Sequence, residues 1–344
     1  MATARLLTRQ DWLALAPTFG DHNFEQSLTY AEAAAARVGA VSRLIAVEDD
    51  DQVLAIANVR VKAVPGLGRG IAWIPSGPLT LRRDRPAPDA DQLAEILGVL
   101  NRKIAGEMGH ILRLRLPGQA PFPLEVVQAA MAGAGFRATI KARDYHSAVV
   151  DLTRTEAELM AALHAKWRSN LRHALKVGIS TDTGDTPELR RRFLQLYAQL
   201  RQDKGFQVDI PPEFYFGLTQ SDLKLEILIV HKDGADLGAS VIAQVGDSAV
   251  YAFAATPDVG RDLRAGYFLT WESIGRARAM GARQLDLGGI DPGGENATVA
   301  RFKVRINAAP FATQAYEASG GGPVARLILG LEALHRRVIV RKGH

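Results

Sequence analysis

The chain has 344 residues, of which 47% are apolar and 23% charged, a composition typical of a globular protein with about two domains. It contains no cysteine, which excludes disulfide bonds and thiolate metal sites. The net charge of +5 favours an anionic partner such as nucleic acid, a nucleotide or a lipid surface, although arginine-rich surfaces are also common without one. Residues 1–19 lack the apolar run of a secretory signal, and no window approaches the roughly 18 apolar residues of a membrane span, so we expect a cytoplasmic protein.

The first half of the chain predicts helices alternating with strands. A helix is expected over Asp11–Val38, followed by a hairpin whose strands, Arg43–Val47 and Gln52–Val59, flank an acidic turn. Apolar residues at helical spacing predict another helix over Ala90–Gly109. The other expected elements are strands over Gly70–Ile74, Ile111–Leu116 and Thr139–Leu152 and a helix over Pro123–Ala134.

A similar order of elements returns in the second half, without visible sequence repetition. A helix over Thr155–Val177 is predicted to begin with a capping box formed by Thr155 and Glu158. The later elements are helices from Pro187 to about Asp203, over Tyr267–Met280 and over Val324–Val340, and strands over Leu225–Val230, Ala239–Val245, Ala249–Ala254 and Gln284–Leu287. The shared plan predicts a duplicated α+β architecture.

The most informative motif follows the last of these strands. It is the glycine-rich and acidic segment Asp286–Glu295, with the pair Phe302–Lys303 a few residues further on. Glycine lets the backbone approach a ligand closely, and a carboxylate-lined turn at the end of a strand is a common place for chemistry.

The charged residues of this motif are candidates for catalysis. Asp286, Asp291 and Glu295 could position or deprotonate an amine. Lys303 could stabilise a developing oxyanion, although a lone lysine is more often a surface residue. The eight histidines show no metal-binding spacing, so we expect no metal.

Two basic segments are candidates for binding phosphate. Arg168, Arg172 and Lys176 stand four residues apart, so on a helix they share one face, and Lys166 precedes them in the same run. A phosphate contact would explain this ridge, and a solvated helix end favoured by the helix dipole is the alternative.

The second basic segment, Pro257–Gly266, precedes a helix, where backbone N–H groups can hold an anion. Its residues Arg261 and Arg264 resemble a degraded form of the acyl-coenzyme A pyrophosphate loop of GNAT acetyltransferases, with Arg264 at the place of the first glycine. An ordinary loop is the alternative.

Taken in order, these residues resemble the Fem family of peptidoglycan-bridge aminoacyltransferases, which are built from two GNAT-like domains. The resemblance covers nearly the whole chain. It rests on Phe24–Ser27 with Tyr30, Lys166–Lys176 with Gly178, Arg201–Phe206, Phe214–Tyr215, and Asp286–Ile290 with Phe302–Lys303.

The resemblance implies two GNAT-like domains, each a mixed, mostly antiparallel sheet flanked by helices. We expect the first over residues 1–150, completed by the C-terminal helix in 318–344, and the second over residues 151–317. A substrate cleft would lie between them.

The resemblance also implies the reaction and its site. An amine on the stem peptide of a peptidoglycan precursor would attack the ester of an aminoacyl-tRNA, and Lys303 would stabilise the tetrahedral intermediate, beside Asp286 and Asp291. The basic helix, with Arg261 and Arg264, would contact tRNA phosphates. Substrate contacts are expected from Gly288, Gly289, Glu295, Tyr251, Phe302 and Tyr215.

Two positions depart from the family pattern. Relatives that bind a UDP-linked precursor place basic residues on its diphosphate, where this chain has Glu32–Ala34 and Asp209. This argues against the UDP-linked precursor, and the acceptor stays open between a UDP-linked precursor, a lipid-linked one and another amine. We expect a monomer without a cofactor, in transient contact with a membrane surface. Two alternatives stay open: an N-acyltransferase that uses acyl-coenzyme A on a small amine, and a non-catalytic module that binds an anionic ligand.

Overall fold

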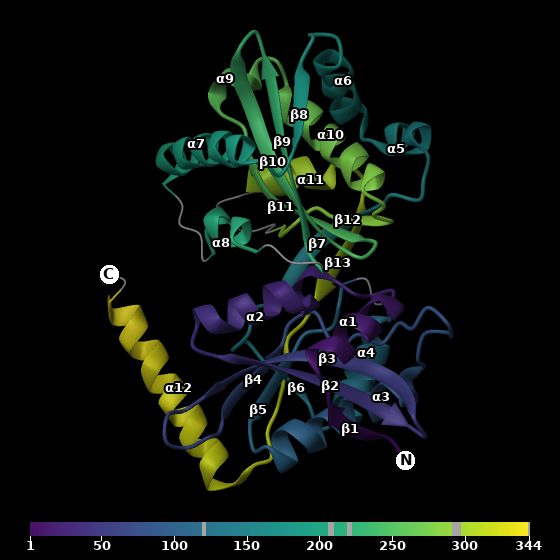
Figure 1. The fold of residues 1–344 in the computed structure, drawn as a ribbon, viewed down its shortest axis with the longest axis vertical. Coiled ribbons are helices and arrows are strands. Elements are labelled where there is room, and N and C mark those ends of the chain that lie inside the picture. Colours follow the sequence, from purple (N-terminus) through teal and green to yellow (C-terminus); the bar gives the residue numbers. More distant parts are fainter. Residues whose placement is uncertain (119–121, 206–209, 219–221, 291–296, 343–344) are drawn as a thin grey trace. The chain divides into compact units, whose positions relative to one another are not determined.

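The computed structural model describes residues 1–118, 122–205, 210–218, 222–290 and 297–342. The chain forms two compact units, Met1–Tyr145 with Thr313–His344 (unit 1) and His146–Ala312 (unit 2) (Figure 1). Each unit consists of one mixed sheet flanked by helices. Across the described residues, every helix is too short or too polar to cross a bilayer.

Unit 1 has a sheet with the order β1-β2-β3-β4-β5-β14-β6 among the described strands. The strands are β1 (Thr3–Leu6), β2 (Val41–Asp49), β3 (Gln52–Ala63), β4 (Gly70–Ile74), β5 (Ile111–Leu114), β6 (Arg137–Ala138) and β14 (Tyr316–Ala318). The helices are α1 (Arg9–Leu15), α2 (Leu28–Arg37), α3 (Ala90–Asn101), α4 (Leu124–Gly133) and α12 (Gly322–Lys342).

The sheet of unit 1 is buried on both faces, because the side chains of its central strands alternate between two apolar cores. In β2, Ile45 and Val47 belong to the core under α3 and α4, whereas Leu44 and Ala46 belong to the core under α1 and α2. The predicted hairpin of β2 and β3 is confirmed, and its strands run beyond their predicted ends.

Unit 2 has a sheet with the order β13-β7-β12-β11-β10-β9-β8 among the described strands. The strands are β7 (Tyr145–Asp151), β8 (Ser180–Gly184), β9 (Lys224–Lys232), β10 (Ala235–Val245), β11 (Ser248–Ala255), β12 (Gln284–Asp286) and β13 (Ala309–Thr313). The helices are α5 (Glu156–Ala162), α6 (Ala165–Ala174), α7 (Pro187–Lys204), α8 (Pro212–Phe216), α9 (Asp258–Arg261), α10 (Ala265–Ala279) and α11 (Ala297–Val304).

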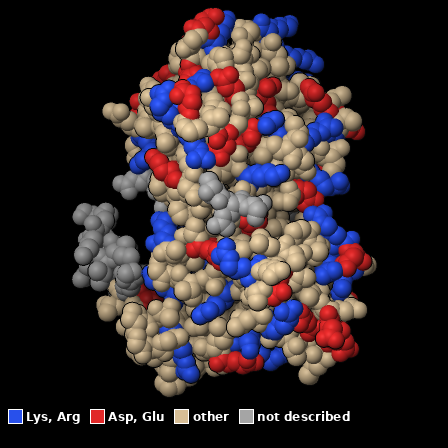
Figure 2. Space-filling model, in the orientation of Figure 1, with Lys and Arg blue, Asp and Glu red and all other residues tan. Residues whose placement is uncertain are grey.

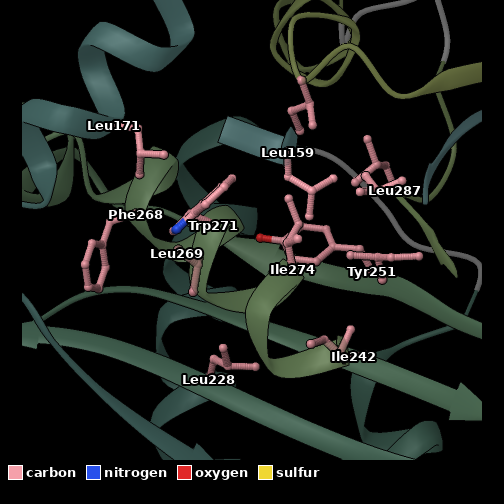
Figure 3. Packing of buried hydrophobic residues seen from close by; sticks show 14 of the residues in the cluster. Leu159, Leu171, Leu228, Ile242, Tyr251, Phe268, Leu269, Trp271, Ile274 and Leu287 are labelled. Carbon is pink, nitrogen blue, oxygen red and sulfur yellow. The ribbon is translucent and has the colours of Figure 1, made fainter. Parts of the chain in front are cut away.

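The main core of unit 2 lies between the sheet and helices α6 and α10. Leu228 of β9 and Ile242 of β10 pack there against Leu269 and Ile274 of α10 (Figure 3). Helix α7 packs on β9, β10 and β11, where its residue Phe193 is fully buried.

The two sheets repeat one topology. In unit 1, three antiparallel pairings (β1–β2, β2–β3 and β3–β4) lead to the parallel pair β4–β5. In unit 2, three antiparallel pairings (β8–β9, β9–β10 and β10–β11) lead to the parallel pair β11–β12. In each unit, the second strand of the parallel pair also pairs with an antiparallel strand. In unit 1 this strand is β14, which comes from a distant part of the chain. In unit 2 it is β7, which directly precedes the other elements of the unit. The predicted duplicated α+β architecture is therefore confirmed.

The predictions of two long helices are wrong. In both regions, a side chain forms hydrogen bonds with backbone groups that lie outside a helix or at its start. The region Asp11–Val38 forms α1 and α2, and the Asp21 carboxylate between them accepts hydrogen bonds from the N–H groups of Thr80 (2.8 Å) and Leu81 (3.2 Å).

The expected helix Thr155–Val177 is divided into α5 and α6, although its predicted capping box is present. Leu163 and His164 between the helices have ψ of 139° and 138°. His164 Nδ1 then accepts the N–H of Lys166 (3.3 Å), so the side chain of His164 starts a new helix.

Candidate active site at the end of strand β12

The site is built where the parallel strands β11 and β12 separate. Their pairing ends at Val250 and Asp286. Beyond it, the chain stays with β7 on the other side, since the N–H groups of Leu287 and Ile290 donate to the carbonyls of Ala148 (3.0 Å) and His146 (2.8 Å). The hydrogen-bonded pairing of β12 with β11 therefore ends at Asp286, whereas the chain beyond it stays bonded to β7.

A buried carboxylate shapes this turn. Asp286 is only 8% exposed, and its Oδ1 accepts hydrogen bonds from the Gly288 N–H (2.8 Å) and from the Ser147 hydroxyl. Gly288 has a φ of +73°, and a Cβ there would lie 2.7 Å from the carbonyl oxygen of Tyr251. Glycine is thus required at position 288 both for its backbone conformation and for the space.

Lys303 is held directly over this turn. Its Nζ donates to the carbonyl oxygens of Gly288 and Gly289, both at 3.1 Å. Burial lowers the pKa of Lys303 to about 8, although the negative charge of Asp286 acts to raise it. At neutral pH the side chain is therefore still mostly an ammonium group, with two of its three N–H donors on these carbonyls.

Aromatic packing fixes helix α11 and with it Lys303. The ring of Phe302 lies 5.6 Å from that of Trp167 in α6 and 5.0 Å from that of Tyr267 in α10. Trp167 and Tyr267 are themselves in edge contact at 5.1 Å. The joint between α5 and α6 adds a backbone bond, in which the His164 N–H donates to the Arg305 carbonyl (3.1 Å).

In unit 1, the corresponding place is closed by the protein's own groups. The parallel strands stay together past their ends, because the Arg115 N–H donates to Ile74 O (3.1 Å) and the Gly77 N–H to Arg115 O (2.9 Å). The fully buried Gln26 then reaches from the N-terminal region and donates to Pro75 O (2.6 Å).

Charged groups complete this closure of unit 1. Glu25 accepts hydrogen bonds from Arg115 and from the Ser76 hydroxyl. Although burial opposes it, the charge of Arg115 and the Ser76 hydroxyl hold the pKa of Glu25 below its usual value. The segment Phe24–Ser27, which contributed to the family resemblance, thus has a structural role here.

The other predicted substrate-binding residues lie at different places in unit 2. The Tyr251 side chain is buried in the main core (Figure 3), and burial raises the pKa of its hydroxyl. Tyr215 lies on α8, with its ring 4.9 Å from that of Phe253. The structure brings Asp286, Gly288, Gly289, Phe302 and Lys303 together, whereas Asp291 and Glu295 lie outside the described residues.

The basic residues of α6 are mostly free to meet a ligand. Among the described residues, Lys166, Arg172 and Lys176 have exposed side chains and form no ion pair, whereas Arg168 donates to the Ala161 carbonyl (2.8 Å) at the end of α5. Lys176 lies just beyond the helix, which ends at Ala174. On the face shown in Figure 2, basic side chains are interspersed with acidic ones and form no broad basic field.

The second basic segment leads into α10. Arg264 has a φ of +59°, a conformation that favours glycine, and its side chain donates to the Arg261 carbonyl (3.1 Å). Arg261 pairs with Asp258 at 2.8 Å on the surface. The structure thus keeps the backbone conformation of a glycine at Arg264, the position where the sequence comparison placed the first glycine of the pyrophosphate loop.

Sequence reasoning missed three residues of this site. Ser147 and Tyr267 carry no local signal, because their role depends on pairing with Asp286 and Phe302 far along the chain. Trp167 could have been found as the large aromatic residue inside the basic run. In the described parts of the chain, histidine, aspartate and glutamate side chains form no group able to hold a metal ion.

Comparisons with known proteins agree with this architecture. Residues 161–303 match the family model described as an acetyltransferase (GNAT) domain, which ends at Lys303. None of the curated proteins matches the chain significantly in sequence. The structure of FemX is similar over 94% of this chain and 99% of its own, with a TM-score of 0.74 and 16% identity.

Two further solved structures are similar. A conserved protein of unknown function from Bacteroides thetaiotaomicron has a TM-score of 0.59 and 12% identity, over 93% of this chain and 100% of its own. The C-terminal domain of a putative lysylphosphatidylglycerol synthetase from Agrobacterium fabrum has a TM-score of 0.50 and 14% identity, over 80% of this chain and 84% of its own.

The fold and the matched domain place the chain in the class of proteins with two GNAT-like units in tandem, as the sequence predicted. Within that class, its fold over nearly the whole chain is that of FemX. The resemblance to the Fem family is thereby confirmed at the level of the fold.

Proposed function

We propose that unit 2 catalyses transfer of an aminoacyl group from aminoacyl-tRNA to an amine of a peptidoglycan precursor's stem peptide. The observation that carries the proposal is the Lys303 ammonium group, held by two backbone carbonyls at the point where β11 and β12 separate. The GNAT domain match supports N-acyl transfer, and the likeness of fold to FemX supports the aminoacyl donor.

In this reaction, the amine nitrogen attacks the ester carbonyl carbon of the aminoacyl-tRNA. The carbonyl oxygen gains negative charge, and the third N–H of Lys303 donates a hydrogen bond to it. Collapse of the intermediate forms the amide and breaks the bond to the ribose oxygen, which takes up a proton as the attacking amine loses one. Lys303 remains protonated throughout and serves as an electrostatic stabiliser.

Asp286 positions the turn in this account. Its Oδ1 binds the Gly288 N–H and the Ser147 hydroxyl, and these contacts fix the two carbonyls that hold Lys303. Positioning of the turn differs from the two roles that the sequence left open for Asp286, which were to position or to deprotonate the attacking amine.

The test uses tRNA charged with labelled amino acids and a muropeptide that carries a free amine. We expect label to move into a product that survives mild base, because an amide resists the treatment that cleaves the aminoacyl ester. The absence of such a product with every charged tRNA would contradict the aminoacyl donor.

One observation favours acyl-coenzyme A as an alternative donor. Arg264, at the N-cap of α10, has a backbone conformation that favours glycine, and the segment around it resembles in sequence the pyrophosphate loop of GNAT enzymes. Thermal-shift titration separates the donors, since a ligand that binds only the folded state raises the melting temperature. Stabilisation by coenzyme A and not by tRNA would favour this alternative.

A further inference from the structure

The inner face of helix α12 packs on unit 1. Ala325 and Ile328 pack against Ile111 of β5, and Ile328 is only 2% exposed. Glu332 forms an ion pair with the buried Arg113 at 2.6 Å. These contacts fix α12 along the outside of unit 1 (Figure 1), so its outer face has a defined position.

The outer face of α12 carries three leucines that are exposed, which we call the outer leucine stripe. Leu327 is 52% exposed, Leu331 40% and Leu334 59%. They are spaced by four and three residues, so they line one side of the helix. The inner face already supplies the apolar contacts that hold α12 on unit 1, and this second apolar stripe is therefore not needed for folding.

The charge of the chain after the stripe identifies its partner. The helix continues to Lys342, and the chain after Glu332 contains Arg336, Arg337, Arg341 and Lys342 but no acidic residue. Helices that lie in the interface of an anionic bilayer combine an apolar side with Lys and Arg. On such helices, apolar side chains enter the boundary of the acyl chains and cations pair with lipid phosphates.

We propose that α12 docks this protein on the surface of an anionic lipid bilayer. The outer leucine stripe supplies the apolar contact, and the four cations near the C-terminus supply selectivity for negatively charged lipid. The inference uses residues far from Lys303 and does not depend on the proposed reaction.

The test is sedimentation of the full-length protein with vesicles. We expect binding to vesicles of equal parts phosphatidylglycerol and phosphatidylcholine that is at least about tenfold tighter than to phosphatidylcholine alone. The triple variant Leu327→Ser, Leu331→Ser, Leu334→Ser should weaken this binding by at least about tenfold.

The matched control changes three leucines exposed elsewhere in unit 1, Leu6→Ser, Leu13→Ser and Leu124→Ser, which are 56%, 41% and 60% exposed. This variant should bind as tightly as the wild type. Melting temperatures verify that both variants are folded.

Three results would overturn the proposal. The first is that the protein does not bind the phosphatidylglycerol vesicles. The second is that the stripe variant binds them as tightly as the wild type. The third is that the outer leucine stripe joins two copies of the chain. The last would appear in light scattering as a dimer that the stripe variant converts to a monomer without any vesicle binding.

Discussion

At the scale of single residues, the buried position of Lys303 carries a cost in stability. Burial favours the neutral amine in the folded state, so its pKa falls to about 8 from the usual 10.5. Holding the ammonium form at neutral pH therefore costs up to about 3 kcal/mol. Such a cost is expected where a charge serves catalysis rather than folding.

We therefore expect Lys303→Met to slow transfer at least about 100-fold at pH 7 but to leave the protein at least as stable at that pH. Between pH 8 and 10.5, the unfolded wild type binds more protons than the folded form, so its unfolding free energy rises with pH across this window. The variant lacks this rise. Urea unfolding at pH 7 and pH 10 measures both effects. A loss of about 2 kcal/mol or more in the unfolding free energy of the variant at pH 7 would count against this view, because it is on the order of one lost buried interaction.

Gly288 gives a second prediction at this scale. A Cβ at Gly288 would lie 2.7 Å from the Tyr251 carbonyl, whereas Gly281, with a φ of +94°, has nothing within 4 Å of such a Cβ. Gly281→Ala should cost about 1–2 kcal/mol for backbone strain, and Gly288→Ala about 1–3 kcal/mol more because the carbonyl must shift. Equal losses in thermal unfolding of the two variants would show that the close approach to Tyr251 has no effect.

At the scale of elements, α6 has a buried side and an exposed basic side. Its buried side supplies Trp167, which packs on Phe302 next to Lys303. Its exposed side supplies Arg172, with Lys176 just beyond the helix end. Under the proposed function, the phosphates of a bound tRNA would meet the same helix that packs beside Lys303.

The double variant Arg172→Ala, Lys176→Ala tests this arrangement. Each phosphate contact that is lost should lower the slope of log affinity for tRNA against log salt by about 1. Arg37→Ala, which removes an exposed arginine from α2 in unit 1, serves as the control and should bind tRNA as the wild type does. An unchanged salt dependence in the double variant would assign α6 the alternative role of a solvated helix end.

Elements with a strong local pattern could be predicted from the sequence. The hairpin of β2 and β3 and the capping box at Thr155 are both present. The breaks in the two long predicted helices could not be predicted from the sequence, because they depend on tertiary hydrogen bonds such as those of Asp21 with Thr80 and Leu81.

At the scale of the whole molecule, one topology occurs twice with different ends. In unit 1 the strands of the parallel pair stay together, with Gln26 bound beside them, whereas in unit 2 they separate at Asp286 and Lys303 lies at the separation. The duplication could be predicted from the order of elements. The contrast could not, because it depends on contacts such as that of Ser147 with Asp286, 139 residues apart.

The most direct measurement of the central claim is the single-turnover rate of amide formation from charged tRNA, for the wild type and Lys303→Met, between pH 6 and pH 9.5. The ratio of the two rates cancels the titration of the attacking amine. If the ammonium group of Lys303 stabilises the oxyanion, we expect a ratio of at least about 100 at pH 7, which falls as the pH rises through about 8. A ratio near 1 at pH 7, or one that rises through pH 8 as for a general base, would contradict this account.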